Sequence, residues 1–137
     1  LHLLDYSYFV KKIFLFVMLV LFFSNSANAD WIMTSKNPSG TTEFYIDKDN
    51  IRKDNSTRYF WLLFNYKDRD VDRKHNSAIV YFQLDCKVLR GKDLKIVTKS
   101  LEMGEGENVL QFSPPDKWKY PIPGSNMEVI FKKVCSL

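Results

Sequence analysis

Residue types that carry most catalytic and redox chemistry are scarce in this sequence. Its 137 residues include 2 histidines and 2 cysteines. The cysteines are too far apart to form a Cys-x-x-C redox pair, and the sequence has no glycine-rich phosphate loop. His75 is the only histidine beyond residue 30, and no glycine-framed serine or spare cysteine accompanies it for a base to activate. We therefore expect no enzymatic activity and no cofactor.

The N-terminus has the pattern of an export signal. Lys11 and Lys12 precede an unbroken apolar run over residues 13–23, which a polar stretch and an A-x-A site ending at Ala29 follow. We predict cleavage after Ala29, which makes residues 1–29 a signal peptide and residues 30–137 a single domain. Residues 1–9 are expected to be upstream readthrough or the product of an alternative start codon.

An uncleaved membrane anchor is the alternative interpretation of this N-terminal segment. The apolar run is shorter than the about 20 residues that a span needs, so we expect no stable membrane anchor after cleavage. No cysteine ends the run, which excludes a bacterial lipid anchor at that point. The formal net charge is +4, too small to indicate a nucleic-acid partner.

Export favours one interpretation of the two cysteines. Cys86 and Cys135 in an exported domain are most simply one structural disulfide. Closing a loop of about 50 residues would stabilise the fold by roughly 4 kcal/mol. The alternative, a redox-active pair, conflicts with the apolar surroundings of both cysteines, where a thiolate is disfavoured.

Apolar alternation predicts a series of β-strands. The clearest pattern lies in residues 77–90, where Ala78, Val80, Phe82 and Leu84 share one face and Cys86 is expected to point into the core. Residues 53–56 and 91–93 are interpreted as turns. The expected strands cover residues 30–35, 42–46, 58–66, 77–90, 94–103 and 108–112.

The C-terminal residues change to a helical period. Ser125 and Glu128 match a capping box. The apolar residues that follow recur at i, i+3, i+4 and i+7 and are Met127, Ile130, Phe131 and Val134. The sequence thus predicts an α+β, mainly β fold: an antiparallel sheet of about five to six strands, with one short C-terminal helix tied to it by the disulfide.

Two surface features could bind a partner or an ion. Residues 67–76 form a charged connection that should project into solvent. Its Asp68-x-Asp70-x-Asp72 spacing begins like a calcium loop, but Arg73 replaces the required glycine and Ile79 the closing glutamate, so we expect no metal site.

The strand over residues 58–66 is apolar on both faces, and its second face is interpreted as core or as a partner or dimer contact.

In these features the chain resembles the surface-adhesin protein E family of exported bacterial proteins. The matching residues extend over residues 31–135. They are Trp31, Phe44-Tyr45-Ile46-Asp47, Ile51-Arg52, Tyr59-Phe60-Trp61, Asp85-Cys86-Lys87, Arg90, Met103-Gly104-x-Gly106, Trp118, Ile122-Pro123-Gly124-Ser125 and Lys133-Val134-Cys135.

The resemblance implies an antiparallel sheet with a helix, a structural disulfide, a tendency to form a homodimer and no catalysis. Members of this kind look like adhesins that bind host matrix or serum proteins such as vitronectin, laminin and plasminogen. Their binding segment is a basic stretch before the cysteine strand, a place that Arg69, Arg73 and Lys74 occupy here.

Two hypotheses follow for the function. The first is an exported, non-enzymatic binding protein that is displayed on the cell surface or secreted. The second is a periplasmic structural or envelope-stress protein without a host ligand, because the chain lacks the lipid-anchor cysteine of the best-known adhesins.

Overall fold

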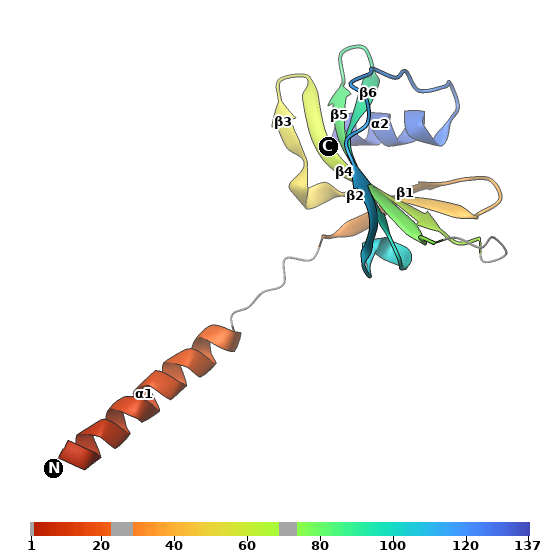
Figure 1. Ribbon diagram of the computed structural model, residues 1–137. Coiled ribbons are helices and arrows are strands. Elements are labelled where there is room, and N and C mark those ends of the chain that lie inside the picture. Colours follow the sequence, from red (N-terminus) through yellow and green to blue (C-terminus); the bar gives the residue numbers. More distant parts are fainter. Residues whose placement is uncertain (1, 23–28, 69–73) are drawn as a thin grey trace.

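A computed structural model describes residues 2–22, 29–68 and 74–137 of the chain. Within the predicted signal segment, His2–Phe22 form helix α1, and the described residues from 29 onward form a sheet with one α-helix (Figure 1). In the described part of the chain, no helix is both long and apolar enough to cross a membrane. Cleavage after Ala29 stays a prediction.

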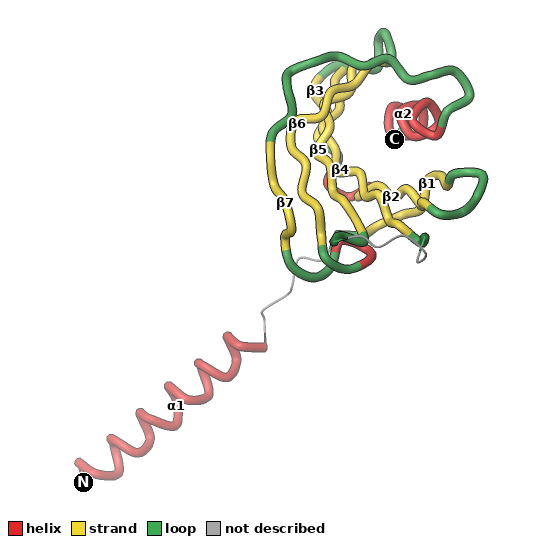
Figure 2. The backbone as a smooth tube through the Cα atoms, turned by 45° about the vertical axis from the view of Figure 1, so that its right-hand side comes forward, coloured by secondary structure: helices red, strands yellow, loops and turns green. Residues whose placement is uncertain are grey.

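Seven strands among the described residues form a single antiparallel sheet. The spatial order is β1-β2-β4-β5-β6-β7, and β3 pairs with the beginning of β4. The sheet is strongly curved, and helix α2 lies on its concave side (Figure 2). The strands are β1 (Trp31–Lys36), β2 (Thr42–Asp47), β3 (Arg52–Asp54), β4 (Thr57–Tyr66), β5 (Ser77–Asp85), β6 (Arg90–Lys99) and β7 (Asn108–Phe112).

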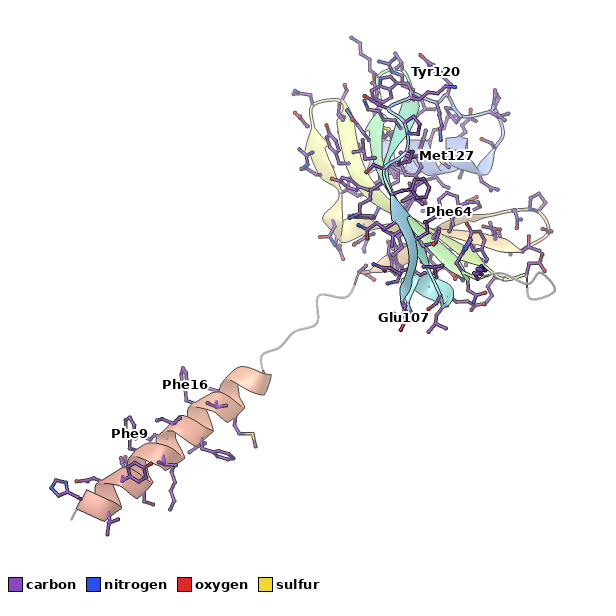
Figure 3. The ribbon with its side chains drawn as sticks, viewed as in Figure 1. Phe9, Phe16, Phe64, Glu107, Tyr120 and Met127 are labelled. Atoms are coloured by element: carbon purple, nitrogen blue, oxygen red, sulfur yellow. A yellow bond between two sulfur atoms is a disulfide. The ribbon has the colours of Figure 1, made fainter. Side chains whose placement is uncertain are left out.

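The hydrophobic core lies between this concave face and α2 (Asn126–Ser136). Alternate residues of the central strands point toward the helix, as the period of a strand requires. Phe60 and Phe82 stack at a centroid distance of 5.5 Å, and Phe131 meets Phe82 edge to face at 6.0 Å. Figure 3 shows that side chains fill the space between α2 and the sheet. The buried core residues are Phe44, Ile46, Phe60, Leu62, Val80, Phe82, Leu84, Ile130, Phe131 and Val134.

Helix α2 begins as the sequence predicts. The Glu128 backbone N–H donates to the hydroxyl of Ser125, which is the N-cap (3.3 Å). The Glu128 carboxylate reaches back to the N–H of Gly124 (3.4 Å), one residue before the cap, because the Ser125 N–H already donates to the carbonyl of Ile122. The end of the helix is fixed by the Cys86–Cys135 disulfide, which confirms the predicted pairing.

The α+β, mainly β prediction is therefore confirmed, but the predicted strand over residues 77–90 is wrong at its end. β5 stops at Asp85, and residues 86–89 form a turn. The Asp85 carboxylate accepts from the backbone N–H of Lys87 (3.0 Å), and Leu89 has a left-handed φ of 52°. Cys86 therefore lies just beyond the strand, where it packs against the edge of the core.

The predicted turn at residues 91–93 is wrong as well, because these residues lie inside β6. Gly91 is required for packing and not for a turn. A Cβ atom at this position would lie 2.6 Å from the Cζ atom of Phe131. β6 consequently starts earlier than the predicted strand over residues 94–103, and it ends at Lys99 before the short 3-10 helix η2 (Glu102–Gly104).

The strand that the sequence did not predict is β3, which lies in the predicted turn over residues 53–56. Its three residues are charged and exposed, so no apolar alternation marks it. It forms because the turn at Asn55, with a left-handed φ of 52°, folds it back on the start of β4. A second 3-10 helix, η1 (Lys48–Asn50), precedes it.

Candidate partner-binding surface

The basic loop that the sequence singled out is described only in part. Arg69 and Arg73 lie outside the described residues, as do Asp70 and Asp72 of the calcium-like spacing, whereas Lys74 is described and exposed. Both ends of the loop are fixed, because Lys67 N–H donates to the carbonyl of Thr41 (2.7 Å) and Asn76 N–H to that of Lys99 (2.9 Å). Within residues 2–22, 29–68 and 74–137, no cluster of three or more acidic, histidine or cysteine side chains could hold a metal ion.

The convex face of the sheet is sealed at one end by the η2 segment. Asn65 is buried there: its side-chain oxygen accepts from the N–H of Met103 (2.7 Å), and its amide nitrogen donates to Glu43 Oε1 (3.1 Å). Ser77, also buried, donates to the carbonyl of Leu101 (2.6 Å) and accepts from the N–H of Gly104 (2.9 Å). These hydrogen bonds satisfy polar groups that burial would otherwise penalise, so this end is structural.

The other end of the convex face carries half-buried aromatic side chains. Trp61 of β4 lies opposite Tyr81 of β5, with ring centroids 4.7 Å apart, and Tyr59 lies 6.3 Å from Tyr81. The Arg52 guanidinium of β3 stacks over the Tyr59 ring at 3.8 Å. We call Arg52, Tyr59, Trp61 and Tyr81 the aromatic patch. The sequence left open whether this face is core or contact surface, and the structure leaves all four side chains partly or fully exposed.

A cavity of about 380 Å³ adjoins the aromatic patch. Trp31, Trp61 and Lys95 line it together with Asp47, a side chain that is only 4% exposed. Asp47 Oδ2 accepts from the side-chain amide of Asn50 (2.7 Å), but its Oδ1 has no hydrogen-bond partner among the described residues. This oxygen is itself inaccessible, so it is a cost to the stability of the domain and not a contact for a partner in this conformation.

Sequence reasoning missed Asp47 because an aspartate at the end of a strand usually begins a turn. The signal that could have found it is the register of β1. Trp31 pairs with Asp47, so both side chains share the convex face.

One tyrosine on the convex face has a perturbed proton affinity. Burial raises the pKa of Tyr45, and the neighbouring Glu43 carboxylate raises that pKa further. The phenol therefore stays neutral at physiological pH and acts as a hydrogen-bond donor. It offers no base for catalysis.

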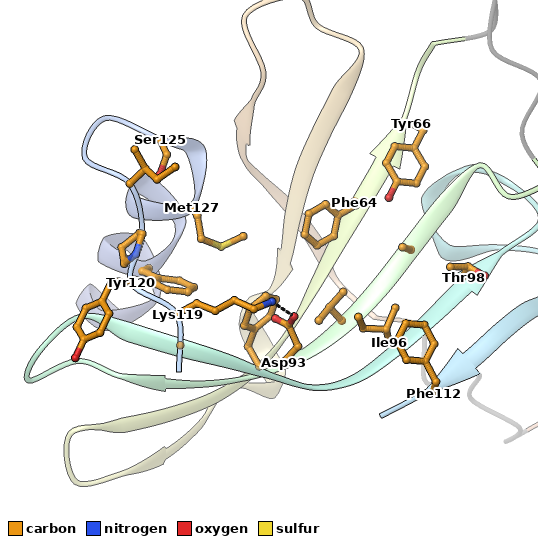
Figure 4. Close-up of a pocket in the computed structure, with 17 residues that line it drawn as sticks. Phe64, Tyr66, Asp93, Ile96, Thr98, Phe112, Lys119, Tyr120, Ser125 and Met127 are labelled. Atoms are coloured by element: carbon orange, nitrogen blue, oxygen red, sulfur yellow. Dashed lines mark hydrogen bonds and ion pairs between the residues drawn. The ribbon is translucent and has the colours of Figure 1, made fainter. Parts of the chain in front are cut away.

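A larger cavity, of about 520 Å³, opens on the concave side. Figure 4 shows its wall of apolar side chains, among them Phe64, Ile96, Phe112 and Met127, and the ion pair between Lys119 and Asp93 at one end. The sequence did not predict this cavity, because its walls come from strands, helix and the proline-rich residues 113–124, which lie far apart along the chain.

The fold occurs in solved structures of Haemophilus influenzae protein E. One crystal form superposes with a TM-score of 0.59 at 17% sequence identity, covering 81% of this chain and 91% of that chain. A second structure gives 0.57 at 19% identity, with 81% and 87% covered. The protein from a non-typeable strain gives 0.53 at 16% identity, with 82% and 79% covered. No curated protein matches the sequence.

The sequence itself matches a family model. The model is described as surface-adhesin protein E, and it covers residues 31–136. The match includes every described strand of the sheet, both cysteines and all of α2. The chain therefore belongs to the surface-adhesin protein E family.

Proposed function

We propose that this chain is an exported, non-enzymatic, adhesin-like protein that binds a host matrix or serum protein of the kind that vitronectin, laminin and plasminogen represent. The observation that carries the proposal is the aromatic patch, exposed on the sheet of a domain from a surface-adhesin family. Tryptophan, tyrosine and arginine are the residues that most often dominate protein interfaces, because each buries a large area and keeps a polar group for a hydrogen bond.

The cavity beside the patch would add specificity to this contact. A partner that covers Trp61 also covers the cavity, whose wall includes Trp31 and Lys95. Lys95 supplies positive charge to the cavity wall, so a carbonyl or carboxylate oxygen of the partner suits the cavity.

The basic residues Arg69, Arg73 and Lys74 are the second part of the proposed site. Exposed ion pairs are individually weak, contributing about 0–1 kcal/mol each. Their expected role is to speed association with an acidic partner, while the aromatic patch provides the slow dissociation. The same patch is the proposed contact if the domain forms a homodimer.

Truncating the patch should weaken binding strongly. We expect Trp61→Ala to lower affinity for immobilised vitronectin, laminin or plasminogen by about 30-fold or more, the loss expected for an interface hot spot worth about 2 kcal/mol. Surface plasmon resonance measures both rates, and the loss should appear in the dissociation rate. Tyr120→Ala is the matched control, because Tyr120 is an aromatic residue that is 66% exposed away from the convex face.

Charge reversal in the loop distinguishes the contribution of the loop to binding from that of the aromatic patch. Arg73→Glu combined with Lys74→Glu should slow association and reduce its salt dependence, with dissociation unchanged. Melting curves of each variant exclude unfolding as the cause. If the wild type binds one of these ligands and Trp61→Ala binds equally well, the aromatic patch is not the site.

Location in the cell tests the adhesin function as a whole. External protease on intact cells should remove the mature protein while a periplasmic marker survives. Complete protection of the protein would overturn the proposal and favour the alternative, a periplasmic structural or envelope-stress protein without a host ligand. N-terminal sequencing of the mature protein should also give Asp30 as the first residue.

A further inference from the structure

The concave cavity has the properties of a small-molecule site. Its volume of about 520 Å³ lies within the roughly 300–1,000 Å³ that ligand pockets usually have. Most of its wall is aromatic or aliphatic, with Phe64, Phe82, Phe112 and Phe131 among the lining residues. Protein interiors are close-packed, so an apolar space of this size calls for an explanation.

The space arises because two elements cover the concave face incompletely. Helix α2 packs its buried stripe on β2, β4 and β5. Residues 113–124 then cross the ends of the strands, where Lys119 and Gly91 exchange both backbone hydrogen bonds (2.9 and 2.8 Å). This bridge holds Tyr120 and Ile122 at the rim and leaves Ile96 and Phe112 facing the open interior.

The cavity is long and has a charged group at one end. Along β6 its wall extends from Asp93 to Thr98, which corresponds to about 16 Å at about 3.3 Å per residue. Lys119 lies beside Asp93, with its ammonium nitrogen 2.6 Å from the carboxylate Oδ2. An ammonium group has three donors, and this contact uses one of them, so Lys119 can bind a second anion.

Lys119 is the basic residue of the cavity wall, because the nearby basic side chains of β6 have carboxylate partners of their own. The Lys92 ammonium contacts Asp116 (2.7 Å) and also lies over the Trp118 ring at 4.6 Å, where Arg90 stacks at 4.4 Å. Arg90 also contacts the Asp85 carboxylate (3.3 Å), and neither Arg90 nor Lys92 lines the cavity.

We propose that this cavity binds a long-chain fatty acid, with the alkyl chain along β6 and the carboxylate at Lys119. An extended single chain fits a long apolar cavity with a cation at one end, whereas a compact polar ligand would leave the apolar wall exposed to water. This site is on the opposite side of the sheet from the aromatic patch and does not depend on the proposed adhesin function.

The methionines of the full chain give a site-resolved assay. Met127 lines the cavity, Met33 lies on β1, Met103 in η2 and Met18 in α1. In protein labelled with ¹³C-methyl methionine, we expect hexadecanoate below its micelle concentration to shift the Met127 signal saturably and to leave Met33 and Met103 unchanged. Each methylene removed from the fatty acid should weaken binding about fourfold.

Two pairs of variants test the assigned geometry. Lys119→Gln should weaken hexadecanoate at least fivefold and leave hexadecanol unaffected, whereas Lys117→Gln, the exposed neighbour, should change neither. Ile122→Asp places a charge on a rim side chain that is 75% exposed and should abolish binding of both ligands. Val129→Asp, on the outer face of α2 and away from the cavity, is its control.

Three results would overturn the proposal. The first is a Met127 signal that hexadecanoate does not move, or a response confined to Met18, which means association with α1 alone. The second is a Met127 response that survives Ile122→Asp. The third is a Met127 shift on dilution of the protein without fatty acid, which would assign the cavity to a second copy of the chain.

Discussion

The double variant Cys86→Ala/Cys135→Ala should lose about 4 kcal/mol of unfolding free energy. The disulfide closes a loop with a sequence separation of 49. A closed loop of this length reduces the conformational entropy of the unfolded chain, and this reduction stabilises the folded domain. Small domains are stable by only about 5–15 kcal/mol in total. The bond also anchors the last turn of α2, a helix too short to persist by itself in water. We therefore expect its loss to bring the domain close to unfolding at 37 °C.

Urea unfolding followed by circular dichroism measures this loss. The wild-type protein under reducing conditions should reproduce the variant. Lys87→Ala/Ser136→Ala is the matched control, since these exposed residues adjoin the two cysteines and their replacement should cost no more than about 0.5 kcal/mol. An unchanged urea midpoint in the cysteine variant would show that the bond contributes nothing to stability.

Phe131→Ala is the second change with a large expected effect. Phe131 is 2% exposed. Its ring packs against Phe82 and against the backbone of Gly91, at the interface between the helix and the sheet. Removing a buried phenylalanine typically costs about 3–5 kcal/mol, because transfer energy is lost and a void remains. Val129→Ala on the same helix is the control, since Val129 is 49% exposed and alanine is the better helix former.

A second substitution distinguishes this packing effect from a general weakening of the helix. Gly91→Ala alone should destabilise the domain, because its Cβ would meet the Phe131 ring at 2.6 Å. In the Phe131→Ala background the same substitution should be tolerated, since the ring is gone. Additive costs in urea unfolding would contradict the close approach of these two residues.

The parts of the fold that the sequence predicts are those where local pattern and burial agree. Ala78, Val80, Phe82 and Leu84 alternate because one face of β5 is buried, and α2 shows its stripe and cap within a dozen residues. Gly91 was misinterpreted because glycine usually marks turns, whereas here an aromatic ring from a distant helix requires it.

The candidate sites show a different limit of prediction from sequence. The sequence shows that the strand over residues 58–66 is apolar on both faces, but it leaves open whether the second face is core or contact surface. The exposure of that face depends on η2, which covers only one end of it. The fatty-acid cavity combines Ile96, Lys119 and Met127 from three separate elements. No local pattern brings such residues together, so tertiary structure is needed to find them.

The edges of the sheet have a consequence for self-association. Among the described strands, β1 is interrupted by a bulge between Met33 and Ser35, and β3 is entirely charged. Both features protect an edge against pairing. β7 is uncharged and all of its side chains are exposed, but its register with β6 is also interrupted by a bulge, between Thr98 and Lys99. Each edge of the described sheet therefore has a feature that opposes strand addition. Growth of a fibre by edge-to-edge pairing of domains is thus disfavoured, and a self-association of this domain would use a face of the sheet and not an edge.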